Sequence, residues 1–175
     1  MNDIDTKHNW RYEKILSLEE AAVKMADLKA SGKKIVSANG SFDLLQAGHL
    51  DFLEEAAEQG DVLIVGINTD RRVKEKKGDL RPIISQENRA ALLAALICVD
   101  FVTFIDGGYD DEPHESFLPA IQSDVHANNL DDYGDHTDWI EWPKMQELGI
   151  EPYGVRRRPN LSTSEIVEKI RKGCT

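Results

Sequence analysis

The sequence predicts an α/β fold in which a doubly wound parallel sheet of five strands carries helices on both faces. Short apolar runs alternate with segments of helical periodicity along almost the whole chain, and this alternation is typical of a parallel sheet. Residues 61–68 and 100–105 are almost continuously apolar, as strands buried on both faces are. In such Rossmann-like sheets ligands bind beyond the carboxyl ends of the strands, so site residues are expected there.

The predicted elements follow from the pattern in chain order. A first helix is expected after Ser17, because Ser17 and Glu20 have the spacing of a capping box and Gly32 can end the helix. Residues 1–16 lack a period and are expected to form an N-terminal arm, which leaves one domain over residues 17–175. Strands are predicted at 34–38, 61–68, 100–105, 123–127 and 150–155, and further helices at 47–59, 86–98, 113–122, 139–148 and 163–172.

Composition restricts the classes of partner. The 32 acidic and 21 basic residues give a formal net charge of −11, which disfavours nucleic acid and anionic membrane surfaces. No apolar run approaches the roughly 20 residues that cross a bilayer, and no charged-then-apolar leader opens the chain. Cys98 and Cys174 form neither a disulfide framework nor a zinc spacing. A cytoplasmic protein is therefore expected.

The string "NGSFDLLQAGH", where the first strand passes into a helix, is the main candidate site. Gly40 permits an unusual turn and close approach of a ligand, and Gly48 removes a side chain at the helix start. Gln46 and His49 share one face near the positive end of the helix dipole, where backbone N–H groups bind anions. The alternative is a plain turn in which Asp43 caps the helix and His49 is only packed.

Two basic segments can add positive charge to this phosphate site. "NTDRRVKEKKGDLRP" follows the second strand and supplies Lys74, Lys76, Lys77 and Arg81, although a solvated basic loop is an equally open interpretation. Arg89, on the next helix, is expected to anchor that loop. "VRRRPNLSTSEI" follows the last strand and contains Arg157 before a second capping box, and its alternative is a well-capped helix with a basic surface patch.

The string "NGSFDLLQAGH" closely resembles the signature of nucleotidyltransferases that carry H-x-G-H after G-x-F-D. The likeness covers nearly the whole chain beyond the arm and is greatest to the adenylyltransferase domain of bacterial ADP-heptose synthases. It implies transfer of a nucleotidyl group from a nucleoside triphosphate to a sugar 1-phosphate, with ATP and heptose 1-phosphate favoured, in lipopolysaccharide or other surface carbohydrate biosynthesis. A stand-alone transferase without the sugar kinase domain of some relatives is expected. Cytidylyl transfer to glycerol 3-phosphate or a similar polyol phosphate is the enzymatic alternative.

The resemblance also implies residue roles. In-line attack of the sugar phosphate on the α-phosphorus needs placement and charge neutralisation but no nucleophilic side chain. Mg²⁺ is expected with the nucleotide, although no metal cage of protein ligands is visible, and a homodimer is possible. The implied catalytic residues are His49, Gln46 and Lys77. The implied nucleotide and phosphate contacts are Asn39, Gly40, Ser41, Phe42, Asp43, Gly48, Lys74, Arg81, Arg157, Ser162, Thr163 and Ser164, and the implied acceptor contacts are Asn128, Asp132 and Tyr133.

Two departures from the family pattern leave another class open. Gln46 stands where the family usually has its first histidine, and a neutral amide makes weaker bonds to phosphate than a charged group. Ala127, Asn128 and Asn129 stand where a lysine and glycines are usual, so the charge of that lysine is missing. A weakly active or inactive nucleotide-binding relative is therefore a further alternative.

Overall fold

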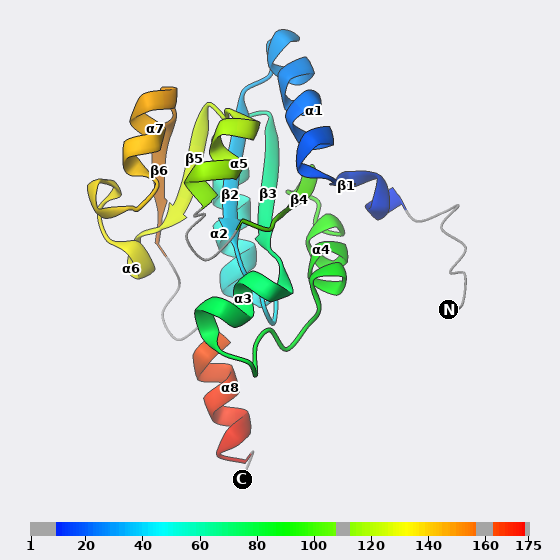
Figure 1. Cartoon of the computed structure of the whole chain (residues 1–175), viewed down its shortest axis with the longest axis vertical. Helices are drawn as coiled ribbons and strands as arrows, with labels where there is room; N and C mark the ends of the chain where they lie inside the picture. Colours follow the sequence, from blue (N-terminus) through cyan, green and yellow to red (C-terminus); the bar gives the residue numbers. More distant parts are fainter. Residues whose placement is uncertain (1–9, 108–112, 157–162, 174–175) are drawn as a thin grey trace.

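The computed structural model describes residues 10–107, 113–156 and 163–173. Its centre is one sheet of six strands in the order β1-β4-β3-β2-β5-β6, and every neighbouring pair is parallel (Figure 1). The α/β, parallel, Rossmann-like prediction is confirmed. The strands are β1 (Ile15–Leu16), β2 (Ile35–Gly40), β3 (Val62–Asn68), β4 (Phe101–Ile105), β5 (Val125–Asn129) and β6 (Glu151–Val155).

The predicted number of five strands is wrong, because β1 adds a sixth at one edge of the sheet. This strand lies within the residues predicted to form the arm, and Ile15 pairs with Val102 of β4. A strand of two residues is too short to show a period, so the sequence pattern does not reveal it. Just before β1, the Lys14 ammonium donates hydrogen bonds to the carbonyls of Leu96 and Val99, at 3.3 and 2.6 Å.

The helices match the predicted ranges except around residues 70 and 130, where the structure has two helices that the sequence analysis did not predict. The capping box is confirmed, since the Ser17 hydroxyl accepts from the Glu20 amide at 3.1 Å and the Glu20 carboxylate accepts from the Ser17 amide at 2.8 Å. The basic segment after β3 forms a helix, α3, whereas the sequence predicted a loop. The helices are α1 (Leu18–Ala30), α2 (Ala47–Ala57), α3 (Asp70–Lys77), α4 (Gln86–Ala94), α5 (Pro113–Ile121), α6 (Leu130–Tyr133), α7 (Trp142–Leu148) and α8 (Thr163–Arg171), with short 3₁₀ turns η2 (Trp10–Lys14) and η3 (His136–Asp138).

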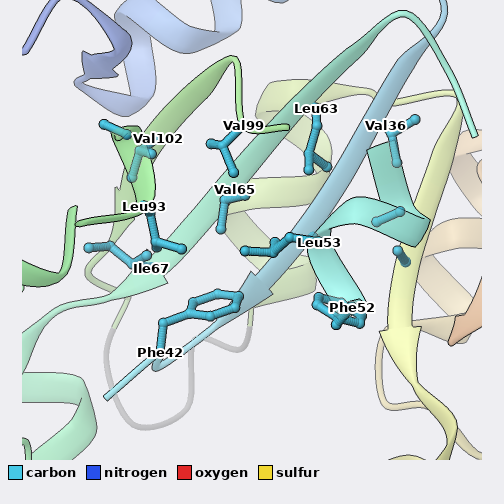
Figure 2. Packing of buried hydrophobic residues seen from close by; sticks show 14 of the residues in the cluster. Val36, Phe42, Phe52, Leu53, Leu63, Val65, Ile67, Leu93, Val99 and Val102 are labelled. Atoms are coloured by element: carbon cyan, nitrogen blue, oxygen red, sulfur yellow. The ribbon is translucent and has the colours of Figure 1, made fainter. Parts of the chain in front are cut away.

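Alternation along the strands divides the core into two layers. Val36 and Val65 belong to the layer under α2 and α4, which Figure 2 shows with Leu53 and Leu93 among its members. Ile35 and Ile64, one residue away along the same strands, belong to the layer under α1, α5 and α7. Burial of both faces explains why these strands are almost continuously apolar in sequence.

The strand order reverses beside β2, which has β3 on one side and β5 on the other. At such a reversal the connections leave the sheet in opposite directions, so a crevice opens beyond the carboxyl ends of the strands. Residues at the ends of β2, β3 and β5 therefore border the candidate site. Among the described residues, the structure contains no helix with the length and apolar character of a membrane span.

Candidate functional site

A cavity of about 400 Å³ lies at the carboxyl ends of β2, β3 and β5. The structure brings most of the predicted site residues together in its wall: Asn39, Gly40, Ser41, Phe42, Asp43, Gln46, Gly48, His49, Lys77, Arg81, Asn128, Asp132 and Tyr133. Four residues of the wall were not predicted as ligand contacts: Phe52, Asn68, Lys76 and Asn129. Asn68 ends β3 and Asn129 ends β5, so the rule that ligands bind at strand ends is the signal that could have found them.

Gln46 and His49 cap the start of α2 reciprocally. The Gln46 side-chain oxygen accepts from the backbone amide of Gly48 at 2.9 Å, and the backbone amide of Gln46 donates to Nδ1 of His49 at 3.3 Å. The N-cap of this helix is therefore Gln46 and not Asp43, so the alternative of a plain turn capped by Asp43 is wrong. Because Nδ1 of His49 accepts a hydrogen bond, the neutral ring carries its proton on Nε2. The cap thus fixes the imidazole as a hydrogen-bond donor through Nε2.

The turn before α2 holds two non-glycine residues in the left-handed region, Phe42 at φ 47° and Leu44 at φ 58°. Side chains disfavour this conformation, and such strain tends to accumulate at functional sites. Gly40 allows the turn to close, since a Cβ there would lie 3.0 Å from the Phe42 ring. The Phe42 ring in turn makes an edge contact with the His49 ring, with centroids 5.5 Å apart. The turn therefore helps to orient His49.

Asp43 fastens a distant loop to this turn. Its buried carboxylate accepts from the amides of Ile83 and Ile84, at 3.0 to 3.1 Å, and lies 2.9 Å from Nε of Arg81. The pair is well shielded from water, so removal of one partner leaves a costly buried charge. Asp43 thus places Arg81 in the wall of the cavity.

Arg89 of α4 is fully buried behind this loop and confirms the expected anchor. Its guanidinium donates to the carbonyls of Asn68 and Ile84, at 2.9 and 3.0 Å, and to the carboxylate of Asp70 at 2.7 Å. A further bond reaches the carbonyl of Ser41. One side chain therefore ties together the ends of β2 and β3, the start of α3 and the loop that follows it.

The lysines of α3 divide by their position. Lys76 and Lys77 line the cavity, whereas Lys74, predicted as a phosphate contact, does not. Lys77 is exposed as a residue, yet burial of its ammonium within the cavity lowers its pKa, and the nearby Arg81 charge lowers the pKa further. Asp43 and Asp132 oppose this shift. A phosphate entering the cavity would favour the charged form of Lys77.

Comparison with known proteins decides the family. A model of the family described as cytidylyltransferase-like matches residues 37–169, which is most of the chain. The chain belongs to the cytidylyltransferase-like family. The resemblance drawn from the string "NGSFDLLQAGH" is thereby confirmed.

The curated relatives of this cytidylyltransferase-like chain include proteins named bifunctional protein HldE. The one from Helicobacter pylori strain G27 is 39% identical over 166 residues, covering 95% of this chain and 33% of that protein. The one from Pelobacter propionicus is 36% identical over 175 residues, covering 97% of this chain and 34% of that protein. The chain spans about a third of the length of these relatives.

Solved structures agree on the fold. The lipopolysaccharide core biosynthesis protein from Thermoplasma volcanium has a TM-score of 0.58 at 28% identity, covering 73% of this chain and 98% of that one. A pantoate-beta-alanine ligase from Francisella tularensis, complexed with beta-gamma ATP and beta-alanine, has a TM-score of 0.60 at 15% identity, covering 90% of this chain and 76% of that one. The second likeness shows the fold alone.

The end of β5 and the short helix α6 form another part of the wall in this cytidylyltransferase-like domain. Asn128, Asp132 and Tyr133, predicted as acceptor contacts, all line the cavity. Asn129 starts α6 as its N-cap, because its side-chain oxygen accepts from the Asp131 amide at 2.9 Å. The chain thus places a polar, mostly neutral wall beside the basic groups of α3 and its loop.

The predicted contribution of the last helix is described only in part. Arg157 and Ser162 lie outside the described residues, and Thr163 and Ser164 begin α8 without a described side chain. Figure 1 shows α8 beneath α3. Val167 of α8, Lys77 at the end of α3 and the loop that follows α3 border a second cavity of about 780 Å³. Across the described part of the chain, no group of three or more His, Cys, Asp and Glu side chains is arranged to hold a metal.

Proposed function

We propose that this protein transfers a nucleotidyl group, AMP from ATP, to a sugar 1-phosphate such as heptose 1-phosphate and releases pyrophosphate. One observation carries the proposal: a single cavity at the strand-order reversal joins the start of α2 to Lys77 and Arg81. In a chain of net charge −11, a triphosphate needs such a local concentration of positive groups. The start of α2 adds backbone N–H groups and the helix dipole.

The proposed chemistry is an in-line displacement. An ionised oxygen of the sugar phosphate attacks the α-phosphorus, a new P–O bond forms, and the bond to the oxygen bridging the α- and β-phosphates breaks. Pyrophosphate leaves with that electron pair, so the step needs neither a protein nucleophile nor a general base. His49 through Nε2, Gln46 through its amide and Lys77 through its ammonium stabilise the negative charge that develops.

Mg²⁺ is proposed to enter with the triphosphate. It would be held with the nucleotide phosphates and would neutralise their charge, as hard cations commonly do with nucleotides. Of the two carboxylates in the cavity wall, Asp43 is engaged by Arg81 and by two backbone amides. The cavity therefore suits a metal held mainly by the nucleotide.

The relatives support the choice of reaction and acceptor. The HldE matches and the motif resemblance to ADP-heptose synthases both favour adenylyl transfer to a heptose phosphate in surface carbohydrate biosynthesis. Cytidylyl transfer to a polyol phosphate is the enzymatic alternative in the same family. A cytoplasmic location and a homodimer stay predictions.

Gln46 favours a second candidate, a nucleotide-binding protein with little turnover. Its side-chain oxygen is used in the helix cap, and its amide carries no charge. Loss of one donor at a transition state costs ~10²–10³ in rate. A binding protein would keep the affinity for triphosphate and lack pyrophosphate release.

The test is a pyrophosphate-release assay on the full chain with Mg²⁺ and each of the four nucleoside triphosphates. Heptose 1-phosphate and glycerol 3-phosphate serve as acceptors, and calorimetry measures nucleotide binding in parallel. We expect the highest kcat/KM with ATP and heptose 1-phosphate. Binding of ATP without turnover of any acceptor would favour the second candidate, and no binding of any triphosphate would refute both.

A further inference from the structure

We propose that Asn39 and Asn128 form a subsite that binds one neutral hydroxyl group of a ligand in the cavity. This inference rests on the proposed function, because it specifies which part of the two substrates the subsite reads. It rests also on an observation that does not depend on any catalytic role: one side-chain amide atom of each asparagine is buried without a hydrogen-bond partner among the described residues.

Both asparagines hold a buried polar atom that lacks a partner. Oδ1 of Asn39 and Nδ2 of Asn128 are buried and make no hydrogen bond with any described residue. Asn128 as a whole is only 4% exposed, and both residues line the cavity. Buried polar groups are nearly always paired in native proteins, so two neighbouring exceptions in one cavity wall need an explanation.

The sheet places the two side chains next to each other. Strands β2 and β5 are parallel neighbours, and Ala38 lies opposite Ala127. Asn39 and Asn128 each follow by one residue, so both point to the same face of the sheet at a spacing of about 4.8 Å between strands. The two amides therefore meet the same small volume of the cavity.

The flanking positions in the sheet offer these amides no polar partner. The residue opposite Asn39 on β3 is Gly66, and the residue opposite Asn128 on β6 is Gly154. A Cβ at Gly66 would lie 2.6 Å from Ile105 and 2.9 Å from Phe117, and a Cβ at Gly154 would collide with Leu130. Apolar side chains thus fill both flanks. Within the described residues, the side on which both amides remain open to a polar partner is the cavity that they line.

The chemistry of the two atoms selects the kind of partner. Asn39 Oδ1 accepts a hydrogen bond and Asn128 Nδ2 donates one. A phosphate or carboxylate oxygen only accepts, and an ammonium group only donates, so neither can satisfy both atoms. A hydroxyl does both, since its O–H donates to Asn39 while its oxygen accepts from Asn128. In the proposed reaction, hydroxyls of this kind come from the acceptor sugar or from the ribose of the nucleotide.

The first experiment removes single hydroxyls from each source. Wild type, Asn39→Leu and Asn128→Leu are assayed with ATP, 2′-deoxy-ATP and 3′-deoxy-ATP, and with heptose 1-phosphate and its monodeoxy analogues. We expect one analogue to lose about tenfold or more in wild-type kcat/KM, because a subsite built to bond a hydroxyl rejects the compound that lacks it. Both variants should give the same kcat/KM for that analogue as for its parent compound. The analogue that responds identifies the source of the hydroxyl.

Asn88→Leu is the matched control for this experiment, because Asn88 is an exposed asparagine of α4 bonded to Ser85. It should keep the wild-type ratio of parent to analogue. Discrimination that persists in Asn39→Leu and Asn128→Leu, or wild-type indifference to every deoxy compound, would overturn the subsite. Absence of turnover with every acceptor is a failure of the proposed function, and the subsite is then decided by protein stability.

The second experiment uses thermal unfolding of the ligand-free full chain. Asn68 serves as the comparison, because it lies at the end of β3 and its Oδ1 accepts from Nε of the buried Arg72 at 3.0 Å. Asn68→Leu should lower Tm by about 3 °C or more, since it removes the side-chain oxygen that accepts from Nε of the buried Arg72. Asn39→Leu and Asn128→Leu should leave Tm unchanged or raise it, because they remove unpaired polar atoms. A fall as large as that of Asn68→Leu would show that the amides have partners within the protein, and would overturn the inference.

Discussion

Acid destabilisation through His126 is the prediction that the structure supports in most detail. His126 lies on β5 and is fully buried, with Nδ1 2.8 Å from the Ser37 hydroxyl, which itself lies 2.6 Å from the Ser123 hydroxyl. Nε2 is buried and makes no hydrogen bond to the described residues. Burial lowers the pKa of this imidazole from 6.5 to about 4. The folded protein therefore holds the ring neutral under conditions where the unfolded chain would protonate it.

The sign and size of the effect follow from these two pKa values. As the pH falls below 6.5, the unfolded chain binds a proton that the folded protein refuses, so the free energy of unfolding falls. The stability that the protein owes to a neutral His126 is fully present above pH 6.5 and is lost as the pH decreases to the folded pKa of about 4. At about 1.4 kcal/mol per pH unit the complete loss is about 3 kcal/mol, and roughly 2 kcal/mol of it is gone at pH 5.

Urea unfolding at pH 7 and pH 5 measures this loss in wild type, His126→Gln and His136→Gln. His126→Gln removes the titrating ring, so its free energy of unfolding should fall by about 2 kcal/mol less than that of wild type between the two pH values. His136→Gln is the control variant. It removes an imidazole that packs on Trp142 with ring centroids 4.7 Å apart and that is far less buried than the imidazole of His126. Carboxylates contribute to all three proteins and cancel in the comparison. An equal loss in wild type and His126→Gln would refute the reasoning.

The remaining predictions concern the cavity. Gln46→His should raise kcat for pyrophosphate release by about tenfold, because a charged donor replaces a neutral one; no gain with intact ATP binding would count against the catalytic role of this position. Lys77→Ala should lower kcat/KM for the triphosphate by at least about tenfold in steady-state kinetics, whereas Lys24→Ala, at an exposed lysine of α1, should leave it unchanged. Asp43→Ala should lower the free energy of unfolding by about 3 kcal/mol, because it leaves Arg81 and two backbone amides without their partner; a loss below about 1 kcal/mol in urea would contradict this.

The sequence could predict the elements whose signals are local. The apolar runs of β3 and β4 are buried on both faces, and Ser17 with Glu20 forms the capping box that their spacing indicates. The turn between β2 and α2 is likewise contained in one string of residues. In each case the physical cause lies within a few positions of the residues that show it, so pattern and structure agree.

Elements that depend on distant partners could not be predicted in this way. Helix α3 is strongly polar in sequence, yet it buries Arg72, whose guanidinium donates to Asn68 and to the carbonyl of Gly107. Asp43 looked like a local helix cap, but its partners Ile83 and Ile84 lie 40 and 41 positions away. Such pairings are decided by tertiary structure, which overrides local propensity.

For the two departures from the family pattern, the structure gives information that the sequence does not contain. Gln46 is accommodated in the place of a histidine, because its side-chain oxygen accepts from the Gly48 amide and its backbone amide donates to His49. Asn128 satisfies no comparable need, since its Nδ2 is buried and unpaired within the described structure. A residue that stabilises its own surroundings can be kept for the fold alone, whereas an unpaired amide in a cavity wall costs stability and suggests a ligand. The substitution at position 46 therefore bears on rate, and the one at position 128 bears on what the cavity recognises.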